Sequence, residues 1–253
     1  MKKSIAQIKA ELMESTGEAR EALLAVCEQD ERKGVRNLVA ALKRQEEALR
    51  AERLRLEEMK CFERKYGERF TAICGIDEAG RGPLAGPVVA GACILPPDVE
   101  ILYLNDSKKL SEKKREVLFQ EIQEKALAWG VGIVSPERID EINILQATFE
   151  AMREAVEQME LTPDLLLVDA VTIPQVKIKQ VGIVKGDAKS VSIAAASILA
   201  KVTRDRLMVQ YDKAYPQYGF AGHKGYGSQA HIAALQEHGP CPIHRRTFIK
   251  NFV

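Results

Sequence analysis

The chain has 253 residues, of which 46% are hydrophobic and 29% are charged. These values are ordinary for a folded globular protein, and they exclude a disordered, a collagen-like and a disulfide-stapled chain. The 37 basic and 36 acidic side chains leave a net charge of only +1, which at first argues against an overtly basic nucleic-acid-binding protein.

The cysteines and the absence of long apolar stretches indicate where the protein works. Five cysteines are scattered along the sequence with no C-x-x-C pair, as expected for reduced thiols. The amino-terminal segment lacks the apolar core of a signal peptide. The least charged long stretch, residues 190–200, is shorter than the roughly 20 residues that a membrane-spanning helix needs. We therefore expect a cytoplasmic protein that makes no contact with a membrane, with a buried helix at 190–200.

Residues 1–70 form the first of two expected domains, a helical extension. They contain no proline and are dominated by strong helix formers, with apolar residues recurring at spacings of four and seven. The pattern predicts helices broken near Gly17 and Gly34, and a long helix over about 35–65. It leaves open whether this extension only packs and solubilises the protein or forms a substrate-binding arm.

Residues 71–253 form the second expected domain, in which short apolar runs alternate with helical patterns. Strands mixed with helices predict an α/β fold, followed by a helical carboxy-terminal region. The expected strands cover residues 71–77, 88–95, 129–134, 165–169, 176–178 and 181–184. The expected helices cover residues 111–127, 136–159, 188 onwards, 204–214 and 228–237.

Acidic residues stand where apolar strands end. Asp77 and Glu78 close one strand, Asp169 closes another, and Asp187 follows a third apolar stretch. Strand ends of an α/β sheet converge on one edge, where sites are normally built. Carboxylates gathered there repel one another and need a cation to ionise together. Oxygen ligands without His or Cys favour Mg²⁺ or Mn²⁺, and two such ions can promote phosphodiester hydrolysis.

The loop after the first strand is rich in glycine, with Gly80, Arg81 and Gly82 directly after the acidic pair. It lacks the G-K-S/T of a P-loop and misses the dinucleotide-binding spacing by one residue. Its glycines fit either a tight strand connection or a close approach of the backbone to a ligand, and Arg81 suits a phosphate. Spacing alone does not decide between these two interpretations.

All four histidines lie near the carboxy terminus. His238-x-x-Cys241-x-x-His244 lacks a usual zinc spacing and is interrupted by prolines. We expect a packed tail there in preference to a metal site.

Residues 75–91 (G-I-D-E-A-G-R-G-P-L-A-G-P-V-V-A-G) resemble the signature of bacterial ribonuclease HII. Several ordered motifs are far more specific than any one of them. The resemblance covers about 71–253, and the extension more weakly resembles that of some Bacillus-type members. Further matching motifs follow in order at residues 105–111, 167–169, 185–187, 193–206, 215–216, 223–227 and 244–248.

The resemblance implies a ribonuclease H-like mixed sheet flanked by helices, and a four-carboxylate site that binds divalent metal. Asp77, Glu78, Asp169 and Asp187 match that site, with Mn²⁺ or Mg²⁺ as the cofactor. The family cuts the RNA strand of RNA–DNA hybrids and incises duplex DNA on the 5′ side of an embedded ribonucleotide, leaving 5′-phosphate ends. These activities belong to DNA replication and repair.

The resemblance also implies how the substrate is read. Gly80, Arg81 and Gly82 match a loop of the family whose backbone reads the ribose 2′-hydroxyl. Tyr226 matches the family's aromatic residue that packs against the deoxyribose beyond the junction and helps to sense that hydroxyl. The 2′-hydroxyl is the group that distinguishes RNA from DNA, so this assignment is chemically sensible. Asn105 and Lys108 are candidates for contacts with the nucleic-acid backbone.

We expect a monomer that needs no organic cofactor. Two other classes remain open: a non-catalytic nucleic-acid-binding module and a small-molecule phosphohydrolase with similar metal chemistry. No motif establishes a protein partner such as a replication clamp.

The near-zero net charge conceals a segregated distribution. Residues 1–70 carry a net charge of +2, residues 71–176 carry −9, and residues 177–253 carry +8. The middle segment contains three of the four proposed catalytic acids. A basic carboxy-terminal surface suits a nucleic-acid backbone while the acidic centre suits cations, so the distribution favours a nuclease.

Overall fold

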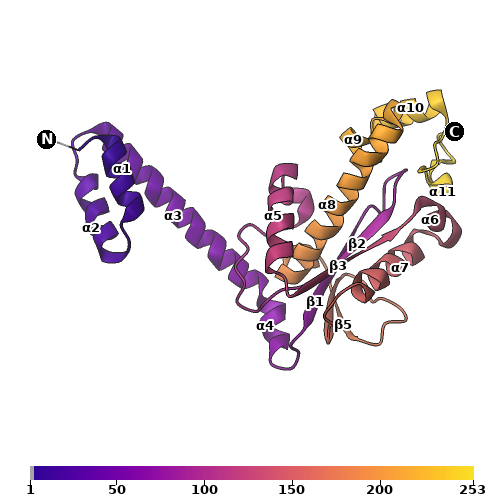
Figure 1. Ribbon diagram of the computed structural model, residues 1–253, viewed down its shortest axis with the longest axis horizontal. Coiled ribbons are helices and arrows are strands. Elements are labelled where there is room, and N and C mark those ends of the chain that lie inside the picture. Colours follow the sequence, from indigo (N-terminus) through magenta and orange to yellow (C-terminus); the bar gives the residue numbers. More distant parts are fainter. Residues whose placement is uncertain (1–2) are drawn as a thin grey trace. The chain divides into compact units, whose positions relative to one another are not determined.

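The computed structural model describes residues 3–253, and its internal contacts divide the chain after Arg55 into two compact units. The first unit contains α1 (Ile5–Glu14), α2 (Gly17–Glu28) and most of α3 (Lys33–Met59), as Figure 1 shows. One face of each helix is apolar, and these faces pack together. The core of this unit consists of Ile8, Leu12, Leu24, Cys27, Val35, Val39 and Leu42.

The end of α3 belongs to the second unit. The helix predicted over 35–65 is interrupted, because α3 stops at Met59 and α4 (Cys61–Gly67) follows it. Leu56 and Met59 are buried in the same core as residues of the second unit.

The second unit is built on one five-stranded mixed sheet, which confirms the α/β prediction. The strand order is β3-β2-β1-β4-β5. β4 runs parallel to both β1 and β5, whereas β2 runs antiparallel to β1 and β3. The carboxyl ends of β1, β4 and β5 therefore share one edge of the sheet. The strands are β1 (Ile73–Ala79), β2 (Val88–Ile94), β3 (Ala128–Val134), β4 (Leu165–Asp169) and β5 (Lys179–Ile183).

Helices cover both faces of this sheet, with α7 on one side and α5 and α8 on the other (Figure 1). Glycines in the strands let the helix backbones approach: a Cβ on Gly132 would collide with the carbonyl oxygen of Ala151 in α7, and one on Gly91 with that of Ala196 in α8. The helices of this unit are α5 (Glu112–Lys125), α6 (Pro136–Ile142), α7 (Ile144–Glu157), α8 (Val191–Ala214), α9 (Phe220–His223), α10 (Gln229–His238) and α11 (Arg246–Ile249), with short 3₁₀ turns η1 (Ser107–Lys109), η2 (Gly186–Ala188) and η3 (Pro216–Tyr218).

The first half of α8 is the buried helix predicted at 190–200. Its side chains from Val191 to Ala200 are all buried, and Ser190 caps its first turn by accepting a hydrogen bond from Ile193 N–H. The helix predicted separately at 204–214 is the continuation of α8. A single continuous helix therefore runs from the core to the carboxy-terminal region.

Two further local predictions are wrong. The helix expected over 136–159 is broken at Asn143, whose φ is +68° and whose side chain accepts hydrogen bonds from Leu145 and Gln146 N–H. Residues 176–178 do not form a strand, because this loop is held by the side chain of Gln180, which bonds both the N–H and the carbonyl of Ile173.

The carboxy-terminal histidines form a buried hydrogen-bonded chain. His231 Nδ1 donates to the carbonyl of Tyr226 (2.9 Å), so its Nε2 accepts from His244 Nε2 (3.0 Å). His244 Nδ1 in turn accepts from the N–H of Cys241 (3.0 Å), so both rings are neutral. His231 and His244 are buried, so this part of the carboxy-terminal tail is packed, as the sequence predicts.

None of the helices within residues 3–253 is both long and apolar enough to cross a bilayer.

The contact between β3 and α7 makes Gly132 sensitive to substitution. Gly132→Ala places a methyl group against the backbone of α7, which must move, and we expect a loss of about 3 kcal/mol in the free energy of unfolding. Gly222→Ala is the matched control, because its Cβ enters open space and α-helix tolerates alanine better than glycine. Urea denaturation measures both, and equal stability of the two variants would contradict the proposed close packing.

The histidine chain predicts a pH dependence of stability. Burial, followed by the effect of His231, lowers the pKa of His244 from its ordinary 6.5 to about 4. The unfolded chain therefore takes up a proton first, so stability present above pH 6.5 is lost as the pH falls to about 4, by about 3 kcal/mol. The stability advantage of the wild type over His244→Gln, measured by urea denaturation, should shrink between pH 7 and pH 4. A difference independent of pH would argue against the neutral chain.

Candidate active site

Two of the predicted acids lie side by side on neighbouring strands. β1 and β4 run parallel with Ile76 opposite Val168, and Asp77 and Asp169 each follow these paired residues by one position. Both carboxylates therefore stand at the carboxyl ends of the two central parallel strands. This is the edge at which sites of open α/β sheets are built.

Asp187 reaches the same edge from the turn that follows β5. The N–H of Gly186 donates to Asp169 Oδ1 (2.8 Å), which ties η2 to the end of β4. Asp187, the next residue, is buried and interacts electrostatically with Asp169. The third strand end thus joins the first two.

Glu78 completes the group of four. It follows Asp77 on β1, and its own N–H donates to Asp77 Oδ1 (2.8 Å). Its carboxylate pairs with Arg81 (3.3 Å) and interacts with Asp169. The structure therefore places all four predicted acids at one sheet edge.

Burial and crowding raise the pKa values of three of these acids. Burial, followed by the charge of Glu78, raises the pKa of Asp77 well above its ordinary value. Burial, with a further contribution from Asp169, raises the pKa of Glu78 although Arg81 opposes the shift. Burial and the charge of Asp106 raise the pKa of Asp187. A positive charge at this edge would lower these pKa values again.

Lys108 supplies part of that positive charge. Burial alone would lower its pKa, but the charges of Asp77, Asp106, Asp187 and Glu78 raise it. The side chain therefore lies within electrostatic reach of the acids. Asn105, the other predicted backbone contact, accepts a hydrogen bond from Asp106 N–H (2.9 Å) at the start of the same turn.

Asp106 was missed by sequence reasoning. It lies within a matched motif, but nothing in the sequence shows that this loop returns to the strand ends. Its side chain accepts from Lys108 N–H (2.9 Å), and, after burial, its charge raises the pKa of Asp187. It is thus a fifth acid beside the four predicted ones.

The loop carrying Gly80, Arg81 and Gly82 lies directly beyond Glu78. Gly80 is buried with φ +94°, a conformation that favours glycine, whereas Arg81 and Gly82 are exposed. The loop packs against the segment that carries Tyr226, since the N–H of Leu84 donates to the carbonyl of Gly225 (2.9 Å).

Tyr226 is 45% exposed, and two cationic side chains lie near its ring. The Nζ of Lys201 lies 6.0 Å from its ring centroid, and the guanidinium carbon of Arg204 lies 5.9 Å away. An exposed aromatic ring flanked by cations is suited to contact with a sugar–phosphate chain.

The donor set fits a hard divalent cation. All four side chains offer oxygen, and the raised pKa values of three of them show that their charges are not balanced by the protein alone. Within residues 3–253 no group of three or more acids, histidines or cysteines is already closed around a metal position. The fit therefore rests on donor chemistry and charge.

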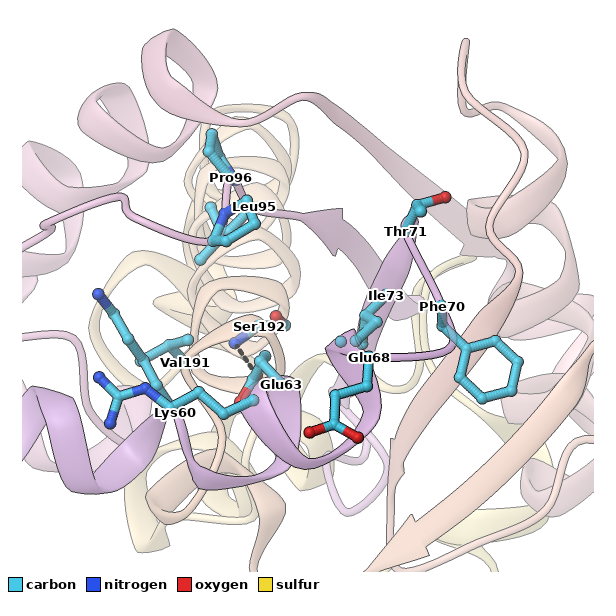
Figure 2. Close-up of a pocket in the computed structure, with 13 residues that line it drawn as sticks. Lys60, Glu63, Glu68, Phe70, Thr71, Ile73, Leu95, Pro96, Val191 and Ser192 are labelled. Atoms are coloured by element: carbon cyan, nitrogen blue, oxygen red, sulfur yellow. Dashed lines mark hydrogen bonds between the residues drawn. The ribbon is translucent and has the colours of Figure 1, made fainter.

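A separate cavity of about 480 Å³ lies at the other end of β1, beside Ile73 and α4 (Figure 2). There Glu63 accepts hydrogen bonds from Ser190 Oγ (2.5 Å) and Ser192 N–H (3.0 Å), which caps the start of α8. None of the predicted site residues lines this cavity, so it is distinct from the acidic edge.

Comparison with known proteins agrees with this architecture. The family model described as ribonuclease HII matches residues 74–251, and the model of the ribonuclease HII N-terminal domain matches residues 4–67. A ribonuclease HII of Lachnoclostridium phytofermentans is 63% identical over 88% of this chain and 87% of its own length. One from Bacillus cytotoxicus is 50% identical over 94% of this chain and 92% of its own.

A solved structure shows the same fold. The complex of PCNA and RNase HII from Archaeoglobus fulgidus contains a chain that is 30% identical, with a TM-score of 0.60. The alignment covers 71% of this chain and 96% of that one. Together with the ordered motifs and the acidic sheet edge, these matches show that the chain belongs to the ribonuclease HII family of nucleases.

Proposed function

We propose that this chain is an endonuclease that hydrolyses the RNA strand of RNA–DNA hybrids and incises duplex DNA on the 5′ side of an embedded ribonucleotide, leaving 5′-phosphate ends. The observation that carries the proposal is the meeting of Asp77, Asp169 and Asp187 at the carboxyl ends of three parallel strands. Membership of the ribonuclease HII family supports the class of reaction.

Asp77, Glu78, Asp169 and Asp187 would hold two divalent cations, Mg²⁺ or Mn²⁺. Bound there, the cations would activate a water molecule and stabilise the departing oxygen of the phosphodiester. The chain contributes the fixed positions of the acids. The N–H of Gly186 orients Asp169, and that of Glu78 orients Asp77.

Residues around the acids would bind and discriminate the substrate. The backbone of Gly80, Arg81 and Gly82 would meet the ribose 2′-hydroxyl, and the ring of Tyr226 would pack on the adjoining sugar. The exposure of Arg81, Gly82 and Tyr226 supports this role. Asn105 and Lys108 would contact the backbone of the duplex, where the amine also moderates the repulsion among the acids.

The same experiments distinguish the proposed nuclease from a non-catalytic binding module and from a small-molecule phosphohydrolase. A non-catalytic binding module gains nothing from gathering acids at one edge beside phosphates, since ionised carboxylates repel the ligand. A small-molecule phosphohydrolase would turn over free phosphate esters in preference to a duplex. The proposed function requires the opposite preference.

A single-ribonucleotide duplex tests the reaction. We expect incision 5′ to the ribonucleotide in Mg²⁺ or Mn²⁺, and Asp77→Asn or Asp169→Asn should lower kcat roughly a thousandfold or more, because each removes a metal ligand worth several kcal/mol of charge stabilisation. Duplex affinity should stay within about threefold, since no phosphate-binding cation is lost.

Asp98→Asn is the matched control for these substitutions. Asp98 is an exposed acid in the loop after β2 and belongs to no part of the proposed site, so its removal should leave kcat unchanged. Folded wild-type protein that cuts no such duplex in either metal would reject the proposed function.

The helical extension is proposed to increase substrate affinity. Its residues up to Arg55 form a compact unit that carries none of the proposed catalytic acids. Removing residues 1–55 spares Leu56 and Met59, which the second unit buries. We expect this deletion to raise the KM for the duplex several-fold while kcat changes less, as steady-state kinetics would show. Unchanged kinetics would instead assign the extension a packing role.

A further inference from the structure

Two arginines, Arg204 in α8 and Arg245 before α11, have fully buried side chains with 0% exposure. Burying a cation is costly unless it is paired and hydrogen-bonded. Within residues 3–253 neither forms a salt bridge, and every hydrogen bond that they donate goes to a backbone carbonyl. Burial, followed by the charge of Arg204, lowers the pKa of Arg245 to about 9. Because burying two guanidinium groups without an acidic partner in this part of the chain costs free energy, their backbone contacts indicate a role beyond packing.

The carbonyls that these arginines bind belong to the segment 80–87 and to the segment before Tyr226. Arg245 donates from three nitrogens to four carbonyls of the first segment: Gly80 (2.5 Å), Arg81 (2.9 Å), Gly86 (2.9 Å) and Pro87 (3.2 Å). Arg204 donates to Ala85 (3.0 Å), Pro87 (2.9 Å) and Lys224 (2.9 Å). Arg204 therefore joins the two segments, and Arg245 holds the first one.

The direction of these carbonyls fixes the direction of two N–H groups. In a trans peptide, the carbonyl of one residue and the N–H of the next point in opposite directions, and residues 3–253 contain no cis peptide bond. Because the carbonyls of Gly80 and Arg81 point at Arg245, the N–H groups of Arg81 and Gly82 point away from it. Both residues are exposed, and neither N–H has a hydrogen-bond partner in the described part of the chain.

We propose that Arg204 and Arg245 are positioning residues that set the preference for a ribonucleotide, by holding the N–H groups of Arg81 and Gly82 toward the ribose 2′-hydroxyl and by fixing Tyr226 beside them. This inference rests on the proposed function. Neither arginine touches the substrate. Each acts through the backbone that it holds.

The planar fork of arginine is essential to this arrangement. Arg245 uses Nε, Nη1 and Nη2 together, and the N–H groups of one rigid plane point in different directions toward three carbonyls. A lysine keeps the charge but offers a single nitrogen, so it cannot hold Gly80, Arg81 and Gly86 at once. Arg245→Lys and Arg204→Lys therefore release the loop while preserving the charge.

The test measures binding in EDTA, which prevents cleavage, to two duplexes that differ only in one 2′-hydroxyl. The ratio of Kd for the all-DNA duplex to Kd for the single-ribonucleotide duplex is the discrimination. We expect Arg245→Lys to lower it about tenfold and Arg204→Lys to lower it in the same direction, with all-DNA affinity within about twofold. A general loss of stability would weaken both duplexes alike.

Arg246→Lys is the matched control, since this neighbouring arginine is exposed and should leave the ratio unchanged. Circular dichroism establishes that each variant is folded, and if Arg245→Lys does not fold, Arg204→Lys decides the matter. A wild type without discrimination would reject the proposed function and this inference with it. A discriminating wild type whose two lysine variants keep the ratio would overturn the inference alone, as would a failure of both variants to fold.

Discussion

The repulsion among carboxylates at one sheet edge is the constraint on which the rest of this structure depends. Asp77, Asp169 and Asp187 are brought together by parallel strands and by a hydrogen bond from Gly186. Burial, followed by the charges of neighbouring acids, raises the pKa values of Asp77 and Asp187, so the fold alone does not neutralise them. Gathering carboxylates at this edge costs free energy, and bound cations would offset that cost.

The packing of the sheet serves this edge. Glycines let the backbones of α7 and α8 lie directly against the strands, so the strand ends have little freedom to separate and relieve the repulsion. The carboxyl half of α8 contacts the loop of residues 80–87, because Arg204 in this helix binds carbonyls of that loop. Arg245, which precedes α11, binds further carbonyls of the same loop. The acids at the strand ends and the two buried arginines are thus all fixed in position by contacts with the backbone.

Much of this arrangement follows from the sequence, because strand-end acids and strand hydrophobicity are local signals. The strand 165–169 and the four acids at one edge of an α/β sheet were predictable in this way. The break at Asn143 was not, since it depends on a positive φ and a side-chain cap inside an otherwise continuous helical pattern. Asp106, Arg204 and Arg245 were also missed as site residues, because their partners are distant in sequence and only tertiary packing brings them together.

The most direct test of the central claim is a calorimetric titration of the folded protein with Mn²⁺ in the absence of nucleic acid. The account predicts saturable binding by the wild type, accompanied by proton release from the raised-pKa acids, and loss of this binding in Asp169→Asn. Absence of binding by the wild type, or equal binding by the variant, would contradict the claim that these carboxylates form a cation site.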